Sequence, residues 1–223
     1  MQRNWAMSSG SSCLRVHGTS GIVIAGGKSR RMGRDKRFLE IGGKALLDRV
    51  LEIMEALFAE IIVVLSEETP VLRQSRWRIV TDLIPQCGSL GGLYTGLYYA
   101  THPRVFAVAC DMPFLNGELV RYMAALNEGA DVVMASLATG LQPMHALYSK
   151  RCLGPLEAMA RSGNLKVQSL VSVTDLNVRL VSEADLMRFD PQLLSFQNIN
   201  TPADLEFART IVAEQQIKRS HQG

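Results

Sequence analysis

The sequence of 223 residues has few of the features that mark zinc-binding, disulfide-rich or membrane proteins. Its four cysteines include no Cys-x-x-Cys pair, which argues against a zinc knuckle, and their wide spacing does not form a disulfide framework. The four histidines are scattered, with no His-x-x-x-His motif. Uncharged apolar runs such as residues 61–65 are far shorter than the roughly 18 residues that a membrane span needs.

The sequence also shows no signal-peptide pattern at its start and no strongly charged block. The first twenty residues lack the apolar stretch of roughly 7 to 15 residues of a signal peptide. The net charge is only +3, and no block of five or six like charges occurs, so we expect no nucleic-acid or membrane partner. We therefore expect a soluble cytoplasmic protein whose thiols stay reduced.

The chain is long enough to bury a core, and its apolar content of 47% argues against global disorder. Residues 1–20 show no hydrophobic period and carry a Ser/Gly cluster, so we expect a flexible N-terminal tail. No repeat or linker divides the remainder, and we expect residues 21–223 to form a single domain.

Short apolar runs alternate with helical patterns along the chain. A β-branched run that two glycines end predicts a buried strand at 21–25, and leucines at helical spacing predict a helix over 45–58. Further strands are expected at 38–41, 60–65, 78–81, 105–110, 131–136, 144–148, 178–181 and 196–200. Further helices are expected at 70–74, 91–100, 117–126 and 155–160, and one that Thr201 caps. This order predicts an α/β fold with a mostly parallel sheet between two layers of helices.

Residues 25–36, AGGKSRRMGRDK, carry the strongest indication of function. Gly26 and Gly27 directly follow the first predicted strand, where backbone N–H groups can approach a ligand and form a concavity for anions. Arg31 and Lys36 add positive charge within reach. Because ligands of open α/β sheets bind at the carboxyl ends of the strands, this combination suits a triphosphate. The alternative is a basic surface loop.

This loop is neither of the two standard phosphate-binding motifs. A P-loop ending in Gly43 and Lys44 would need a glycine at the position of Phe38. A dinucleotide fingerprint that begins at Gly26 would need a glycine at the position of Lys28.

Two aspartates follow predicted strands at the same edge of the expected sheet. Asp111, within CDMPF, is a natural Mg²⁺ ligand, because Mg²⁺ is held by one or two protein groups plus substrate phosphates. Its alternative is a turn or cap aspartate. Asp82 precedes a second glycine-rich loop, in which Gly91 and Gly92 would let a nucleobase or ribose approach the backbone. The alternative there is close helix packing, above all for Gly96.

The sequence NINTP at 198–202 forms the fourth motif. Alternation in the expected short strand would put Asn198 and Asn200 on one face, where a carbonyl oxygen could complete a Mg²⁺ shell. The alternative is a turn and helix cap, which explains Thr201 and Pro202 but does not require both asparagines.

Together these motifs resemble the nucleotidyltransferase family that activates pterin and sugar phosphates, and in particular its molybdenum cofactor guanylyltransferases. The family pattern L-A-G-G-x-S-x-R-M-G-x-D-K matches residues 24–36, with Ile24 in place of leucine. C-D-x-P-F and N-x-N-T-P follow in order, and the resemblance covers about residues 21–212. It implies a Rossmann-like domain of the nucleotide-diphospho-sugar transferase type. It also implies transfer of GMP from GTP to molybdopterin, with pyrophosphate released.

The motifs and the resemblance together give the expected site. The expected nucleotide-binding residues are Ile24, Ala25, Gly26, Gly27, Lys36, Asp82, Gly91, Gly92 and Asp111. The expected catalytic residues are Lys36, Arg31 and Asp111, and the expected metal ligands are Asp111 and Asn200. The pterin side would be lined by Gln142, Pro143 and Asn198. Mg²⁺ is the expected cofactor, GTP and molybdopterin are the expected substrates, and transient contacts with molybdoenzymes or their chaperones would follow.

Two departures from the family pattern fall near the nucleobase. Ser89 stands where the family's second glycine loop carries proline, and Ser66 is the nearest polar residue where the family often has asparagine. Two alternatives stay open. A cytidylyltransferase would typically read A-A-G where this chain reads A-G-G from Ala25. A non-catalytic nucleotide carrier would be expected to lack Asp111 or Lys36, which are both present.

Overall fold

The computed structural model describes residues 15–26, 35–67 and 76–220 of the chain. Its strands are β1 (Thr19–Ile24), β2 (Glu40–Ile41), β3 (Lys44–Ala45), β4 (Ile61–Leu65), β5 (Arg78–Thr81), β6 (Arg104–Ala109), β7 (Val132–Leu137), β8 (Gly140–Ser149) and β9 (Val178–Ser182). Its α-helices are α1 (Leu46–Leu57), α2 (Gly88–Tyr99), α3 (Gly117–Ala125), α4 (Leu153–Arg161), α5 (Glu183–Leu186) and α6 (Pro202–Ser220). Its 3-10 helices are η1 (Lys36–Phe38), η3 (Lys150–Cys152), η4 (Val167–Ser172) and η5 (Leu194–Phe196).

Seven strands form one sheet in the order β5-β4-β1-β6-β8-β7-β9. The strands from β5 to β6 pair in parallel, and β7 pairs in parallel with β9. Only β8 runs antiparallel to its neighbours, β6 and β7, within this sheet. Every residue of β1 is buried, as expected for a central strand covered on both faces. The predicted mostly parallel sheet is confirmed.

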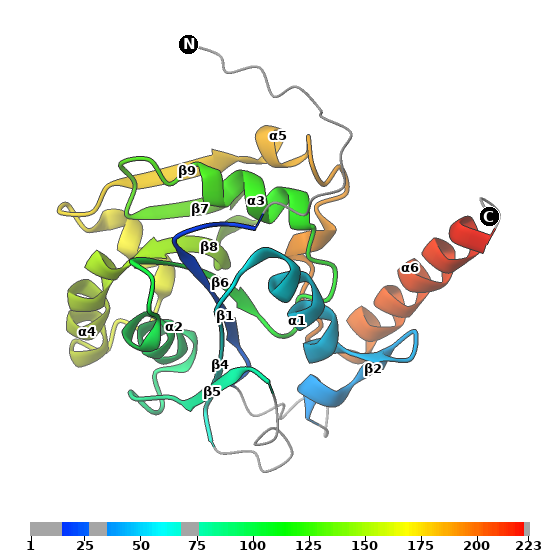
Figure 1. The fold of residues 1–223 in the computed structure, drawn as a ribbon, viewed down its shortest axis with the longest axis horizontal. Coiled ribbons are helices and arrows are strands. Elements are labelled where there is room, and N and C mark those ends of the chain that lie inside the picture. Colours follow the sequence, from blue (N-terminus) through cyan, green and yellow to red (C-terminus); the bar gives the residue numbers. More distant parts are fainter. Residues whose placement is uncertain (1–14, 27–34, 68–75, 221–223) are drawn as a thin grey trace.

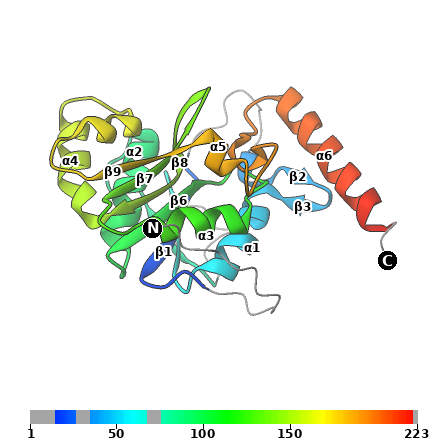
Figure 2. The same cartoon turned by 90° about the horizontal axis from the view of Figure 1, so that it is seen from above.

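Helices cover both faces of this sheet (Figures 1 and 2). On one face, α1, α3 and α5 pack against side chains such as Val23 and Val108. On the other, α2, α4 and η4 pack against their sequence neighbours, such as Ile22 and Ala107. This alternation along each strand follows from the opposite directions of successive side chains. The predicted three-layer α/β/α architecture is therefore confirmed.

The C-terminal helix lies apart from these layers. α6 extends away from the sheet beside the β2–β3 hairpin (Figures 1 and 2). A third apolar cluster joins the two, and its buried members are Ile41, Leu46, Ile199, Leu205, Ala208 and Val212. The first turn of α6 therefore has a fixed place relative to the hairpin and to the residues just before it, including Asn200.

The prediction of a flexible tail over residues 1–20 is wrong for residues 15–20. β1 begins at Thr19 rather than at residue 21, and the Val16 N–H donates to the Leu57 carbonyl at 2.8 Å. Ser20 is fully buried and donates its hydroxyl to Glu60. Residues 15–20 therefore belong to the folded part, whereas the rest of the expected tail, residues 1–14, lies outside the described residues.

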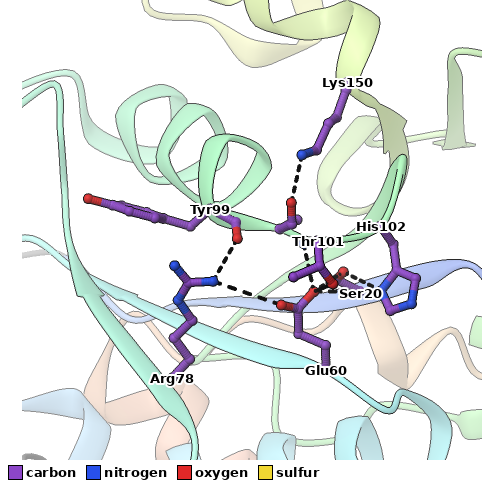
Figure 3. Close-up of polar contacts among 8 residues, drawn as sticks. Ser20, Glu60, Arg78, Tyr99, Thr101, His102 and Lys150 are labelled. Atoms are coloured by element: carbon purple, nitrogen blue, oxygen red, sulfur yellow. Dashed lines mark hydrogen bonds and ion pairs between the residues drawn. The ribbon is translucent and has the colours of Figure 1, made fainter.

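Glu60 is the centre of a polar network at the amino end of the sheet (Figure 3). Its Oε2 accepts hydrogen bonds from Ser20 and from both the N–H and the hydroxyl of Thr101, while Arg78 and His102 lie within 4.0 Å of the carboxylate. Burial would raise the pKa of Glu60, but the hydrogen bonds from Ser20 and Thr101 outweigh it and leave the pKa lowered. This network ties β1, β4 and β5 to the loop before β6.

Several predicted elements have different bounds or a different form. The strand expected at 196–200 is wrong: η5 ends at Phe196, and residues 197–200 have no regular structure. Residues 36–38 form η1, so the strand expected at 38–41 is reduced to β2. The helix expected at 91–100 begins at Gly88 as α2. The helix expected at 70–74 lies outside the described residues.

Candidate active site

The site forms at the carboxyl edge of the sheet, where β1, β4 and β6 end side by side. The Cys110 N–H donates to the Ile24 carbonyl at 3.1 Å, and the Ala25 N–H donates to the Val64 carbonyl at 2.8 Å. A Cβ added to Gly26 would lie 3.0 Å from the Ser66 nitrogen, which is tighter than most real contacts. Glycine at this position therefore lets the chain leave β1 directly against the end of β4.

Asp111 and Lys36 meet at this edge. Asp111 is the second residue after the end of β6. Lys36 is the first residue of η1, and the cap residue of this helix, Asp35, accepts a hydrogen bond from the Arg37 N–H at 3.1 Å. The Lys36 Nζ lies 3.6 Å from the Asp111 Oδ2. Burial raises the pKa of Asp111, and the nearby Lys36 ammonium offsets part of that rise.

Asn200 completes this group from the far end of the chain. The Lys36 Nζ donates to the Asn200 Oδ1 at 2.6 Å. The backbone N–H of Ile199, the residue before it, donates to the Asp111 carbonyl at 2.9 Å. Ile199 is fully buried in the third apolar cluster, so this segment is anchored on both sides. Three predicted site residues that are far apart in sequence therefore lie together.

The start of α6 holds the Asn200 backbone. The Asp204 Oδ2 accepts from the N–H groups of Asn200 and Thr201, each at 2.8 Å, and these hydrogen bonds lower the pKa of Asp204. In return, the Thr201 hydroxyl accepts from the Asp204 N–H at 3.2 Å. This reciprocal cap confirms the predicted helix start at Thr201.

The oxygens of Asp111 and Asn200 fit a magnesium ion. Both are oxygen ligands of the kind that hard cations such as Mg²⁺ prefer, and both already lie beside one cation, the Lys36 ammonium. Among the residues that the structure describes, no group of three or more His, Cys, Asp or Glu side chains could hold a metal. The protein would therefore supply part of a shell that substrate phosphates and water complete, which is usual for Mg²⁺.

Asp82 lies at the end of β5 and holds the loop that follows. Its Oδ1 accepts from the Ile84 N–H and from the Thr95 hydroxyl, each at 3.0 Å, while the Thr95 oxygen accepts from the Leu83 N–H at 2.9 Å. Burial raises the pKa of Asp82 more than these hydrogen bonds lower it. The nucleotide role of Asp82 stays a prediction.

Gly91 and Gly92 lie inside α2, not in a loop before it. A Cβ on Gly91 would lie 2.6 Å from the Asp82 Oδ2, and one on Gly92 would lie 2.8 Å from the Ile24 Cγ2. Close packing of α2 on β1 and Asp82 therefore accounts for both glycines. Their expected contact with a nucleotide stays a prediction.

The residues expected on the pterin side lie at this edge of the sheet, but their hydrogen bonds within the described part of the chain are to residues near them in sequence and not to Lys36, Asp111 or Asn200. Gln142 and Pro143 lie in β8, and Gln142 donates to the Gly140 carbonyl at 3.2 Å. The Pro143 carbonyl accepts from Tyr148 at 2.7 Å, and the Asn198 carbonyl accepts from Gln197 at 3.4 Å. Asn198 and Asn200 do not share a strand face, because residues 197–200 are not a strand. Gly27 and Arg31 lie outside the described residues.

Comparison with protein families identifies the group to which the chain belongs. The family model of the MobA-like NTP transferase domain matches residues 21–178, which include most of β1 as well as Asp82 and Asp111. The chain belongs to the MobA-like NTP transferase family. The predictions of a nucleotidyltransferase and of its α/β fold are thereby confirmed.

Curated relatives match nearly the whole chain. One from Pelotomaculum thermopropionicum, named a probable molybdenum cofactor guanylyltransferase, is 38% identical over 200 residues, covering 90% of this chain and 96% of its own length. Another from Desulfosudis oleivorans, named a molybdenum cofactor guanylyltransferase, is 36% identical and covers 86% of this chain and 95% of its own.

A solved structure has the same fold. The molybdopterin-guanine dinucleotide biosynthesis protein A of Archaeoglobus fulgidus superposes with a TM-score of 0.76 at 28% identity, covering 87% of this chain and 99% of its own. Each of these three matches covers more of the chain than residues 21–178, the region that the family model matches.

Some residues that build this candidate site were not expected there from the sequence. Asp35 caps η1, Thr95 holds Asp82, and Asp204 fixes the Asn200 backbone. Asp35 and Asp204 had a usable signal, since Asp35 is the aspartate of the pattern matched at residues 24–36 and Asp204 stands three residues after Thr201 at a helix start. Thr95 is fully buried and pairs with a carboxylate 13 positions earlier, which no local pattern shows.

Proposed function

We propose that this chain transfers GMP from GTP to molybdopterin, forming the guanine dinucleotide form of the cofactor and releasing pyrophosphate. The observation that carries the proposal is the convergence of Lys36, Asp111 and Asn200 beside the end of β1. Membership of the MobA-like family and the names of the guanylyltransferase relatives support it.

The reaction requires an in-line displacement at phosphorus. A phosphate oxygen of molybdopterin attacks the α-phosphorus of GTP, a new P–O bond forms, and the bond to the pyrophosphate oxygen breaks. The protein mainly orients the two substrates and supplies positive charge. Lys36 and Arg31 would offset the charge that grows on the pyrophosphate. Mg²⁺ bound by Asp111 and Asn200 would add Lewis-acid stabilisation of phosphate oxygens.

The two substrates would lie on opposite sides of Asp111. The backbone at Ile24, Ala25, Gly26 and Gly27, with Asp82, Gly91 and Gly92, would receive the nucleotide on the β4–β5 side. Gln142, Pro143 and Asn198 would receive the pterin on the β8 side, because β8 is the neighbour of β6 there.

We also propose that residues 21–223 act as one domain, together with the residues just before them that complete β1, since α6 and the segment before it hold Asn200 beside Asp111. The reaction would take place in the cytoplasm, and the product would pass to molybdoenzymes or their chaperones through transient contacts. No helix in the described part of the chain has the length and apolar character to cross a membrane.

Two measurements test the proposed nucleotide and acceptor. GTP with Mg²⁺ should raise the melting temperature, because a ligand at about 100 times its Kd adds about 2.7 kcal/mol, and CTP should raise it much less. Single-turnover transfer from GTP labelled at the α-phosphate should then give labelled dinucleotide only with molybdopterin. Equal stabilisation by CTP would reject guanine, and GTP binding without transfer would favour the carrier alternative.

A further inference from the structure

Lys36 occupies the position between the two oxygens proposed as metal ligands. Its ammonium is 2.6 Å from the Asn200 Oδ1 and 3.6 Å from the Asp111 Oδ2. The side chains of Lys36 and Asp111 are only 19% and 21% exposed. The ion pair is therefore largely shielded from water. Opposite charges attract more strongly in such a place than in bulk water.

A carboxylate in this setting needs a positive neighbour. A carboxylate with little access to water is stabilised by an opposite charge close by, and the Lys36 ammonium supplies one at 3.6 Å. An ammonium and a divalent cation cannot both stay against the same oxygens, because two positive charges at such short range repel each other. A metal that takes the Asp111 Oδ2 and the Asn200 Oδ1 must therefore displace Lys36.

Lys36 is also the partner that can move. Asp111 is held through its backbone carbonyl by the Ile199 N–H, and the Asn200 backbone is held by Asp204. Lys36, in contrast, carries its charge on a flexible four-carbon stem, and its side chain alone reaches the site. A phosphate chain at the end of β1 offers that ammonium another set of oxygens.

We propose that Lys36 is the counter-ion of Asp111 in the nucleotide-free protein, and that it makes binding of a divalent metal depend on a nucleoside triphosphate. The triphosphate attracts the ammonium away, and the oxygens of Asp111 and Asn200 become available to the metal. By linkage, nucleotide and metal raise each other's affinity by the same factor. This inference rests on the proposed function, because it takes Asp111 as a metal ligand.

Binding of Mn²⁺ alone, without nucleotide, tests this role directly. Free Mn²⁺ measured by EPR titration should give a Kd at least ten-fold lower for Lys36→Gln than for wild type. Lys36→Met should give the same gain, which would exclude the glutamine oxygen as a new ligand. Lys44→Gln is the matched control. Lys44 lies outside the site, where its Nζ pairs with the Glu52 Oε2 at 2.6 Å, so the Kd of this variant for Mn²⁺ should equal that of wild type. Lys36 variants that bind Mn²⁺ no tighter than wild type would overturn the inference.

A second comparison separates this inference from the proposed function. The gain in Lys36→Met should disappear when Asp111→Asn is added. A GTP analogue with a methylene group between the α- and β-phosphorus should tighten Mn²⁺ binding at least ten-fold more in wild type than in Lys36→Met. A gain that survives Asp111→Asn would reject Asp111 as the ligand, and the proposed site with it. If the Lys36 variants bind Mn²⁺ no tighter than wild type while GMP transfer still depends on Asp111, only the role of Lys36 would be rejected.

Discussion

Charge at the proposed site is balanced residue by residue. Asp111 is mostly buried, so its ionised form costs the folded state free energy, as its raised pKa indicates. Lys36 offsets part of that cost from 3.6 Å away. An apolar side chain would serve stability at this position at least as well as a buried carboxylate. The carboxylate therefore fits a role in binding a cation better than a role in stability.

Replacing this carboxylate should separate stability from turnover. Asp111→Asn keeps the shape of the side chain and removes the buried charge, so we expect the melting temperature to stay within a few degrees of wild type. GMP transfer should fall by about a hundred- to a thousand-fold, the usual effect of losing one strong electrostatic contact. Asp48→Asn, on the exposed surface of α1, should change neither quantity. Near-normal transfer by Asp111→Asn at ordinary Mg²⁺ would reject the ligand role.

His145 is a second buried titratable residue, and it lies in β8 next to the expected pterin side. It is fully buried between Phe106 and Phe196, with ring centroids 5.3 and 4.7 Å away. Neither ring nitrogen has a hydrogen-bond partner among the residues that the structure describes. Burial lowers the pKa of His145 to about 4, so the ring is neutral in the folded protein at pH 7.

This histidine should make the protein sensitive to acid. Its pKa is lower when folded than when unfolded, so the unfolded chain binds more protons and stability falls as the pH drops from about 6.5 to about 4. A shift of this size corresponds to about 3 kcal/mol once the pH is below both values. Urea unfolding of His145→Leu across this range should show a flatter pH dependence than wild type. His17→Leu, at an exposed position, should keep the wild-type slope, and an equal slope for His145→Leu would contradict the expectation.

At the scale of elements, the sequence predicts those whose burial follows a simple period. The apolar run of β1 and the leucines of α1 needed no tertiary information. The strand expected at 196–200 failed because Ile199 is buried by the third cluster, not by a sheet face. The pairing of Lys36 with Asn200 was also hidden, since the two residues are 164 positions apart and only the fold brings them together.

The small residues of α2 set how closely it packs on β1. A Cβ added to Gly96 would come too close to the side chain of Ile22, a fully buried residue. Gly96→Ala should therefore destabilise the protein by about 1 to 3 kcal/mol through overpacking, measured by urea unfolding. Gly154→Ala in α4 is the matched control, because nothing lies within 4 Å of the added Cβ. That control should stabilise by about 0.5 to 1 kcal/mol, and the same gain for Gly96→Ala would show that α2 can shift freely.

At the scale of the whole molecule, the proposed site depends on two parts that meet at its edge. The sheet supplies Asp111 and the end of β1, while η1 and the segment just before α6 supply Lys36 and Asn200. The third apolar cluster is what joins α6 to the hairpin after η1. The packing of a helix outside the three layers therefore controls the geometry of the site.

Weakening this cluster should reduce turnover while the sheet stays intact. Leu205 is 8% exposed, and Leu205→Ala removes apolar contacts near the start of α6, typically at a cost of about 2 to 5 kcal/mol in a core. Because α6 lies apart from the sheet, that cost should appear as local opening, with faster amide hydrogen exchange in α6 and protection retained in β1 and β6. GMP transfer should fall about ten-fold or more, since the Asn200 backbone loses its fixed position. Phe207→Ala removes an exposed side chain from the same helix and should change neither exchange nor transfer. Full transfer by Leu205→Ala despite faster exchange in α6 would mean that Asn200 does not depend on the packing of this helix.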